Sequence, residues 1–125
     1  MSIALANEFL PFARNLAKEN IIPRRHVSLI FLRGRLISAG QNRRDKTHPL
    51  AEKYNYLFGC PHSELDAWTK IRHFDYDKLV LINYRFSNKS VLGMSKPCQH
   101  CMKWCEAIFH RMWYSTGNGD EFTRC

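Results

Sequence analysis

The sequence predicts a single α/β domain in which helices pack against a sheet. Its 125 residues, 45% of them hydrophobic, suffice for one domain with its own core, since domains commonly contain about 100 to 150 residues. In some segments apolar residues recur every three or four positions, which is typical of helices. In others they alternate or run together, which is typical of strands. No repeat or linker interrupts the sequence, so residues 1–125 are interpreted as one domain.

The first half of the chain predicts a helix followed by a β-hairpin. Apolar residues near the N-terminus share one helical face, and Pro11 is expected to start or kink that helix. These apolar residues are Leu5, Phe9, Phe12, Ala13 and Leu16. Residues 27–32 and 35–39 alternate about Arg33-Gly34, which predicts two strands joined by a tight turn. Residues 42–60 mix polar residues, proline and aromatic residues, so we expect a loop that walls a substrate site.

The middle of the chain predicts another helix and a buried strand. Pro61 is tolerated at a helix start, and an apolar stripe follows it. The stripe consists of Leu65, Trp68 and Ile71. Residues 79–86 begin as a continuous apolar run, which predicts a central strand covered by helices on at least one face. Residues 87–89 then predict a turn.

The C-terminal part predicts a third amphipathic helix and a further strand. The helix follows Pro97 and places its apolar residues at Met102, Cys105 and Ile108 or Phe109. Residues 111–115 predict a strand, and residues 116–119 predict a turn before a short last segment.

Two short segments, far apart in the sequence, carry the residues of a zinc site. They are His62-Ser63-Glu64 and Pro97-Cys98-Gln99-His100-Cys101. One imidazole and two thiolates suit Zn²⁺, and three protein ligands leave a fourth position for water, as in catalytic sites. Zinc lowers the pKa of bound water to about 7, so hydroxide becomes available at neutral pH. With Glu64 to move protons, this set suits hydrolytic deamination of a ring carbon that bears an amino group.

The two segments resemble the H-x-E and P-C-x-x-C motifs of the cytidine and deoxycytidylate deaminase superfamily. The resemblance covers roughly residues 27–115 and is specific, because four chemically demanding residues and a proline must coincide. It implies that His62, Cys98 and Cys101 bind zinc and that Glu64 is the general acid/base. It also implies a three-layer α/β/α fold, in which a mixed central sheet carries helices on both faces.

Three further residues are candidates for substrate contact. Asn42 matches an asparagine that family members often have after the second strand, where it touches the substrate sugar. Pro97 matches the proline before the first cysteine, and Ser63 stands where the family usually has a small apolar residue. Trp68 also departs from the family pattern, since a smaller aliphatic residue is common there. Neither departure involves a metal ligand.

The chain carries a formal net charge of +8, most of it in the first half. Residues 1–53 hold 10 Lys/Arg and 4 Asp/Glu (+6), whereas residues 54–125 hold 9 and 7 (+2). The basic clusters are Arg24-Arg25, Arg33 with Arg35, and Arg43-Arg44 with Lys46. They suit the phosphate of a nucleotide or of single-stranded nucleic acid, although a solvated charged face explains any one cluster equally well.

Cysteine usage and hydropathy place the protein in an intracellular, cytoplasmic setting. The apolar runs are too short to span a membrane and no secretory signal is recognisable, so no membrane partner is expected. Apart from the two candidate ligands, Cys60, Cys105 and Cys125 form an odd set with no disulfide framework. We interpret all three as inert buried cysteines, with Cys60 near enough to the motif to support a ligand. The family likeness also allows a homo-oligomer.

Other polar and aromatic residues have simpler interpretations. Aromatic residues could stack on a base, but core packing is favoured for Tyr54, Tyr56, Phe58, Trp113 and Tyr114. Isolated histidines are interpreted as structural or surface residues, and these are His26, His48, His73 and His110. His100 stands between the two cysteines, where contact with a substrate phosphate and simple exposure both remain open. Asp66 and Lys70, four positions apart on a helix, predict a solvated ion pair.

The sequence therefore favours a zinc-dependent hydrolytic deaminase of a cytosine-type nucleoside or nucleotide, converting C to U with release of ammonia. The compact chain motivates this choice, because it has few loops to wrap a polymer. A polynucleotide cytosine deaminase acting on single-stranded DNA or RNA is the first alternative. A non-catalytic zinc module is the second, but a structural site gains nothing from the carboxylate of Glu64.

Overall fold

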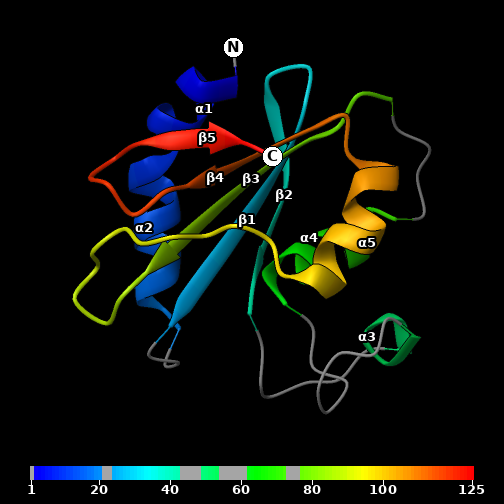
Figure 1. The fold of residues 1–125 in the computed structure, drawn as a ribbon, viewed down its shortest axis with the longest axis horizontal. Coiled ribbons are helices and arrows are strands. Elements are labelled where there is room, and N and C mark those ends of the chain that lie inside the picture. Colours follow the sequence, from blue (N-terminus) through cyan, green and yellow to red (C-terminus); the bar gives the residue numbers. More distant parts are fainter. Residues whose placement is uncertain (1, 21–23, 43–48, 54–61, 73–76) are drawn as a thin grey trace.

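The structure is a computed structural model that describes residues 2–20, 24–42, 49–53, 62–72 and 77–125, and the statements below concern these residues. The helices are α1 (Ser2–Glu8), α2 (Leu10–Lys18), α3 (Pro49–Lys53), α4 (Ser63–Thr69) and α5 (Gln99–Ile108). The strands are β1 (Arg25–Leu32), β2 (Arg35–Gln41), β3 (Val80–Phe86), β4 (Arg111–Ser115) and β5 (Phe122–Arg124). Together they form a mixed α/β fold (Figure 1).

The five strands form one mixed sheet in the order β2-β1-β3-β4-β5. Strand β1 is antiparallel to both β2 and β3, β3 is parallel to β4, and β4 is antiparallel to β5. The predicted hairpin is confirmed: Arg33 and Gly34 form its turn with φ of 52° and 79°. Two successive residues with positive φ match the twist of a two-residue hairpin, and glycine at the second position adopts this conformation without strain.

Helices cover both faces of the sheet, as expected from the sequence. Alternate side chains of a strand point to opposite faces, so β1 and β3 contribute to two separate cores. On one face α1 and α2 pack on Leu29 and Tyr84, and on the other Ile30 and Leu81 pack with residues of α4 and α5. The central pair of strands is therefore buried on both sides, which accounts for the apolar run in β3.

The N-terminal helix prediction is confirmed at Pro11 and needs one correction. The helix is divided at Phe9 into α1 and α2, and Pro11 lies in the first turn of α2, as expected for a proline that starts a helix, where its missing N–H is tolerated. The buried face consists of Ala6, Leu10, Ala13 and Ala17, whereas Phe12, predicted on the apolar stripe, is 43% exposed. Small alanine side chains let α2 approach the sheet closely, so the larger Phe9 and Leu16 are only partly buried.

The predicted strands and the last helix agree with the structure to within two residues at either end. Strand β4 has the predicted bounds, and α5 starts after Cys98. The loop expected over residues 42–60 contains the short helix α3, and the rest of it from residue 43 lies outside the described residues.

Residues 87–98 join β3 to α5, and we call them the connecting segment. It turns at Ser87, whose carbonyl accepts from the N–H of Ser90 at 2.9 Å. It then runs back beside the sheet, pairing Phe86 with Leu92 and Met94 with Thr116. Because it ends at Cys98, its path sets where α5 begins.

Candidate metal centre

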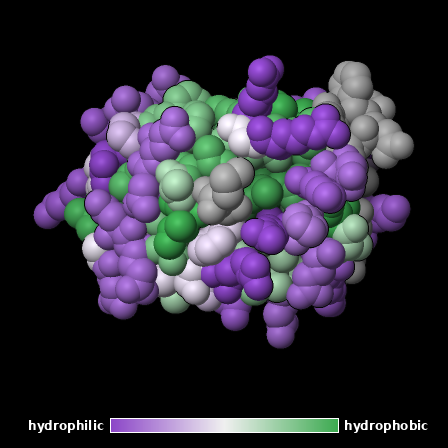
Figure 2. Space-filling view, turned by 90° about the horizontal axis from the view of Figure 1, so that it is seen from above, coloured by the Kyte–Doolittle hydropathy of each residue, from purple (hydrophilic) through white to green (hydrophobic). Residues whose placement is uncertain are grey.

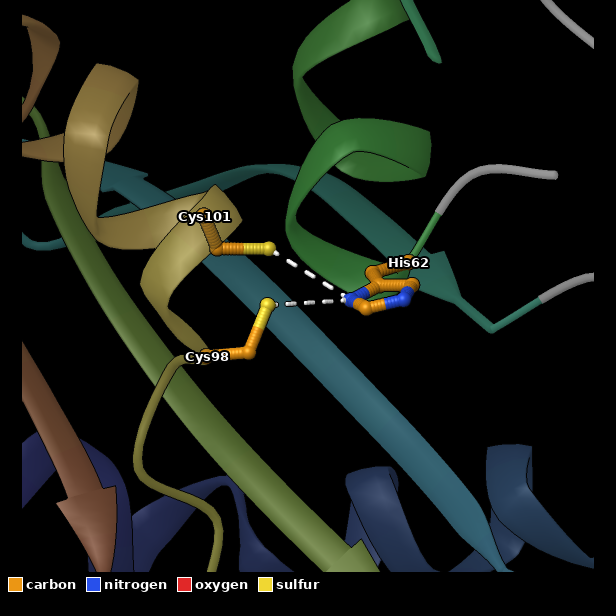
Figure 3. Close-up of side chains that lie close together, drawn as sticks. All are labelled: His62, Cys98 and Cys101. Atoms are coloured by element: carbon orange, nitrogen blue, oxygen red, sulfur yellow. Dashed lines mark hydrogen bonds between the residues drawn. The ribbon is translucent and has the colours of Figure 1, made fainter. Parts of the chain in front are cut away.

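Helices α4 and α5 start close together, which brings His62, Cys98 and Cys101 to one place (Figure 3). His62 and Cys98 are the N-caps of their helices, both with extended backbone, and neither makes a side-chain capping hydrogen bond. Cys101 lies in the first turn of α5 and is buried. The imidazole and both sulfurs therefore face one another across the space between two helix starts.

The distances between these side chains fit a tetrahedral metal site. His62 Nδ1 lies 3.4 Å from Cys98 Sγ and 3.7 Å from Cys101 Sγ. A tetrahedral zinc with bonds of about 2.3 Å to sulfur and 2.0 Å to nitrogen separates neighbouring donors by about 3.5 to 3.8 Å. The three donor atoms all lie within 4.8 Å of one another, and no fourth His, Cys, Asp or Glu joins the group among the described residues. The cluster could hold a metal ion.

The charges at this cluster favour a bound cation. Hydrogen bonding to Cys101, opposed by burial and helped by His62, lowers the pKa of the Cys98 thiol from 9.0 to about 3. Its hydrogen bond to Cys98 raises the pKa of His62. The start of α5 adds the positive end of a helix dipole beside the thiolate. A metal ion binds the neutral imidazole and the thiolate forms of these residues, so metal binding is expected to release protons.

We expect the purified protein to bind about one equivalent of zinc, and we expect Cys98→Ser to weaken that binding by more than a hundredfold. Changing a group that merely supports a ligand costs about 10 to 100-fold in metal affinity, so loss of a ligand should cost more. Competition with a chromophoric chelator measures the affinity. Cys125→Ser is the matched control, because Cys125 is exposed and is not part of the cluster. Equal affinity for both variants would contradict the proposed ligand set.

Glu64 lies next to this cluster, in the first turn of α4, with its side chain only 5% exposed. Oε2 accepts a hydrogen bond from Asn83 Nδ2 at 2.9 Å, and Oε1 accepts one from Ser63 Oγ at 3.2 Å. Within the described part of the chain, no Lys or Arg nitrogen lies within ion-pair distance of the carboxylate. A buried carboxylate held by neutral donors alone is costly to the fold, and such groups are concentrated at functional sites.

The structure places the candidate substrate residues as follows. The Asn42 side chain bridges backbone groups at the start of β1, since Oδ1 accepts from the N–H of His26 and Nδ2 donates to the carbonyl of Arg24. Ser63 is 1% exposed, and its hydroxyl lies 2.7 Å from that of Ser28. Pro97 is buried immediately before Cys98. Substrate contact by these three residues stays a prediction.

Sequence reasoning missed two polar residues beside Glu64. Ser28 on β1 and Asn83 on β3 are cross-strand partners, and both are buried on the sheet face that packs against α4. Ser28 Oγ donates to Asn83 Oδ1 at 2.6 Å. The available signal was a lone polar residue inside each apolar strand, because buried polar side chains need partners.

His26, interpreted from the sequence as a structural or surface residue, lies near enough to His62 and Cys98 for their charges to affect its pKa. It pairs with Arg85 in the β1–β3 register, on the same face as Ser28 and Asn83. Burial, followed by the charges of Arg85, His62 and Arg24 and opposed by Cys98, lowers the pKa of His26 to about 4. Arg85 and Arg24 therefore add positive charge to this part of the sheet, beside the cluster.

The low pKa of His26 predicts a loss of stability in acid. Between pH 6.5 and about 4 the unfolded chain binds a proton that the folded protein excludes, so unfolding becomes easier as the pH falls through this range. Each pH unit contributes at most about 1.4 kcal/mol. Urea midpoints of chelator-treated wild type should fall more steeply between pH 7 and pH 4 than those of His26→Gln. If the urea midpoints of the two proteins change in parallel with pH, the pKa of His26 is not lowered by folding.

The remaining predictions have mixed outcomes. The Asp66–Lys70 ion pair exists at 3.7 Å, but the Asp66 side chain is fully buried and accepts a hydrogen bond from the N–H of Gln41, so the expectation of a solvated pair is wrong. Cys105 is buried as expected, and burial raises its pKa, whereas Cys125 is exposed. Trp113 packs with the core on the α1/α2 face, as favoured.

Some predicted residues cannot be placed. Cys60, His48, His73, the basic cluster at residues 43–46 and the aromatic residues 54, 56 and 58 lie outside the described residues. The side chain of His100 does so too.

A cavity lies at the other end of α5 from Cys98 and Cys101. Figure 2 shows the molecule from above the view of Figure 1, where hydrophilic side chains surround smaller apolar areas. The cavity has a volume of about 430 Å³ and is lined by Glu106, Phe109, His110, Arg111, Met112, Arg124 and Cys125. It contains none of the metal-binding residues, and it lies at the C-terminal end of α5, which carries the negative end of the helix dipole.

Comparisons with known proteins give no family for the chain. No protein-family model, no curated protein and no solved structure matches it. Among the described residues, no helix has both the length and the apolar character needed to cross a bilayer.

Proposed function

We propose that this chain is a zinc-dependent hydrolytic deaminase with a cytidine deaminase-like fold, acting on a cytosine-type nucleoside or nucleotide. The observation that supports it most is a buried carboxylate, Glu64, two residues from the histidine of a three-donor metal cluster. A structural metal site has no use for such a carboxylate. The mixed sheet and the helices on both its faces agree with what the motif resemblance implies.

His62, Cys98 and Cys101 would hold the zinc, which when bound supplies hydroxide at neutral pH. Glu64 would carry two protons in turn: one from the attacking water to the ring nitrogen, and then one from the hydroxyl group added to the ring carbon to the amino group, which leaves as ammonia. Because Asn83 and Ser63 donate to its two oxygens, the carboxylate starts from a fixed orientation. Its burial keeps bulk water from competing for the transferred proton.

The first alternative, a polynucleotide cytosine deaminase, has support from charge. Arg24 and Arg85 lie near enough to His26 to lower its pKa, so two positively charged side chains lie near the cluster. Their charge suits any substrate that bears phosphate. A polymer contacts many cations at once, so its binding should weaken steeply as salt is raised, whereas a mononucleotide should respond weakly.

A substrate panel tests the proposal directly. Zinc-loaded protein is incubated with cytosine, cytidine, deoxycytidine, their monophosphates and single-stranded DNA and RNA oligonucleotides, and ammonia release is measured with the one-unit mass increase. We expect conversion of at least one nucleoside or monophosphate. Conversion of oligonucleotides alone would favour the alternative. No conversion of any member, by protein with a full equivalent of zinc, would contradict a cytosine deaminase.

A further inference from the structure

We propose that Asn83 is a positioning residue that fixes the Glu64 carboxylate relative to the metal-binding start of α5. The inference rests on the proposed function above. It assigns a role to a residue in the middle of β3 that neither motif contains. Asn83 is 3% exposed, and every polar atom of its side chain faces a partner in a different element.

The orientation of the Asn83 amide follows from its neighbours. Nδ2 donates to Glu64 Oε2 at 2.9 Å and to the carbonyl of Ser95 at 3.3 Å, while Oδ1 accepts from Ser28 Oγ at 2.6 Å. A carbonyl oxygen can only accept, and a carboxylate also accepts, so the NH₂ group must face both of them. The opposite orientation would turn Oδ1 toward two acceptors.

Asn83 also holds the segment that carries a metal ligand. Ser95 Oγ donates to the backbone carbonyl of Asn83 at 2.7 Å, and Ser95 stands three residues before Cys98. On its other side Ser95 is held by β4, where the N–H of Ser115 donates to Ser95 Oγ at 2.8 Å. One residue of the central sheet therefore bonds both the carboxylate of α4 and the connecting segment that leads to α5.

Two serines complete the support around Glu64. Ser28 uses its single hydrogen to reach Asn83 Oδ1, so the 2.7 Å contact between Ser28 and Ser63 takes its hydrogen from Ser63. The same Ser63 hydrogen can also point to Glu64 Oε1, 3.2 Å away. Ser63 is the position that departs from the family pattern, where a small apolar residue could make neither contact. The departure at Ser63 and the amide at Asn83 are thus parts of one network.

The hydrogen-bond network orients the Glu64 carboxylate, and it contributes little to the stability of the fold. Apolar residues of similar shape would fill these buried positions at little or no cost in stability. Polar groups held by partners from β1, β3, α4 and the connecting segment instead leave the carboxylate a single position. Removing such an outer partner of a reactive group typically lowers activity by about 10 to 100-fold.

The test compares Asn83→Ala and Ser63→Ala with Ser38→Ala. Ser38 is the matched control, because it is a buried serine that donates to α4, at the carbonyl of Ala67, and does not touch Glu64. We expect Asn83→Ala to lower kcat by about 10 to 100-fold with KM and zinc content little changed. Ser63→Ala should show a smaller loss and Ser38→Ala none. Wild-type kcat in folded, zinc-loaded Asn83→Ala would overturn the inference.

A double-mutant cycle gives a second readout that needs no activity. Urea midpoints are compared for wild type, Asn83→Ala, Glu64→Ala and the double variant. If Asn83 holds the carboxylate, the two single shifts will not add; additive shifts would overturn the inference. Should wild type convert no substrate, the proposed function fails on its own, and the cycle still decides whether Asn83 positions Glu64.

Discussion

Replacing Glu64 by Gln is expected to lower turnover by about 10² to 10⁴-fold while leaving zinc binding and the fold intact. This range is what a positioned general acid/base contributes in enzymes. The amide of glutamine occupies nearly the same volume but cannot accept and return a proton at neutral pH. Steady-state kcat on the best substrate of the panel measures the loss, and zinc content is measured on the same sample.

The surroundings of Glu64 explain why the fold should survive this change. A glutamine Oε1 can accept from Asn83 Nδ2 in place of Glu64 Oε2, and its Nε2 can donate to Ser63 Oγ, so no buried polar atom loses its partner. A buried charge disappears at the same time. The urea midpoint of Glu64→Gln is therefore expected to equal or exceed that of wild type.

Glu106→Gln provides the control for a change of charge alone, since Glu106 is exposed near the other end of α5. Its kcat should match that of wild type. If Glu64→Gln keeps full turnover, Glu64 is not the proton carrier. If Glu64→Gln and Glu106→Gln both bind zinc and neither converts any substrate, the non-catalytic zinc module becomes the better interpretation.

Features fixed by local sequence were predictable. Alternation about Arg33-Gly34 predicted the hairpin because a tight turn and a period of two are both local properties. The cluster that could hold a metal ion was predictable for a different reason: a histidine and two cysteines at that spacing are typical metal ligands, and these are His62, Cys98 and Cys101. In both cases the types of residue and their local spacing are enough to predict the feature.

Features set by long-range register were not predictable. Nothing in the sequence says that Ser28 lies opposite Asn83, or His26 opposite Arg85, because pairing of β1 with β3 joins segments more than 50 residues apart. The same limitation concealed the burial of Asp66, which depends on β2 lying beside α4. Phe12 was misplaced because the close approach of α2 to the sheet selects small residues, which hydrophobic spacing does not show.

Because α4 lies directly against β2 at Gly40, we expect Gly40→Ala to disrupt both the fold and the metal centre. A Cβ at Gly40 would overlap the backbone N of Ala67 and lie 2.5 Å from the carbonyl oxygen of Ser63 and 2.8 Å from Ala67 Cα. These are backbone atoms of α4, which cannot move aside singly. Either β2 or the whole helix must shift.

We expect Gly40→Ala to lower the free energy of unfolding by more than the roughly 1 to 3 kcal/mol that ordinary overpacking costs. Since α4 carries Glu64 and begins next to His62, its displacement should also weaken zinc binding. Urea unfolding and chelator competition measure the two effects. Gly93→Ala is the matched control, because nothing lies closer than 4.0 Å to its added carbon, and we expect its stability to stay within about 0.5 kcal/mol of wild type. A Gly40→Ala protein as stable as the control would show that α4 does not lie against β2 as described, and would remove the geometric basis for placing Glu64 beside the metal cluster.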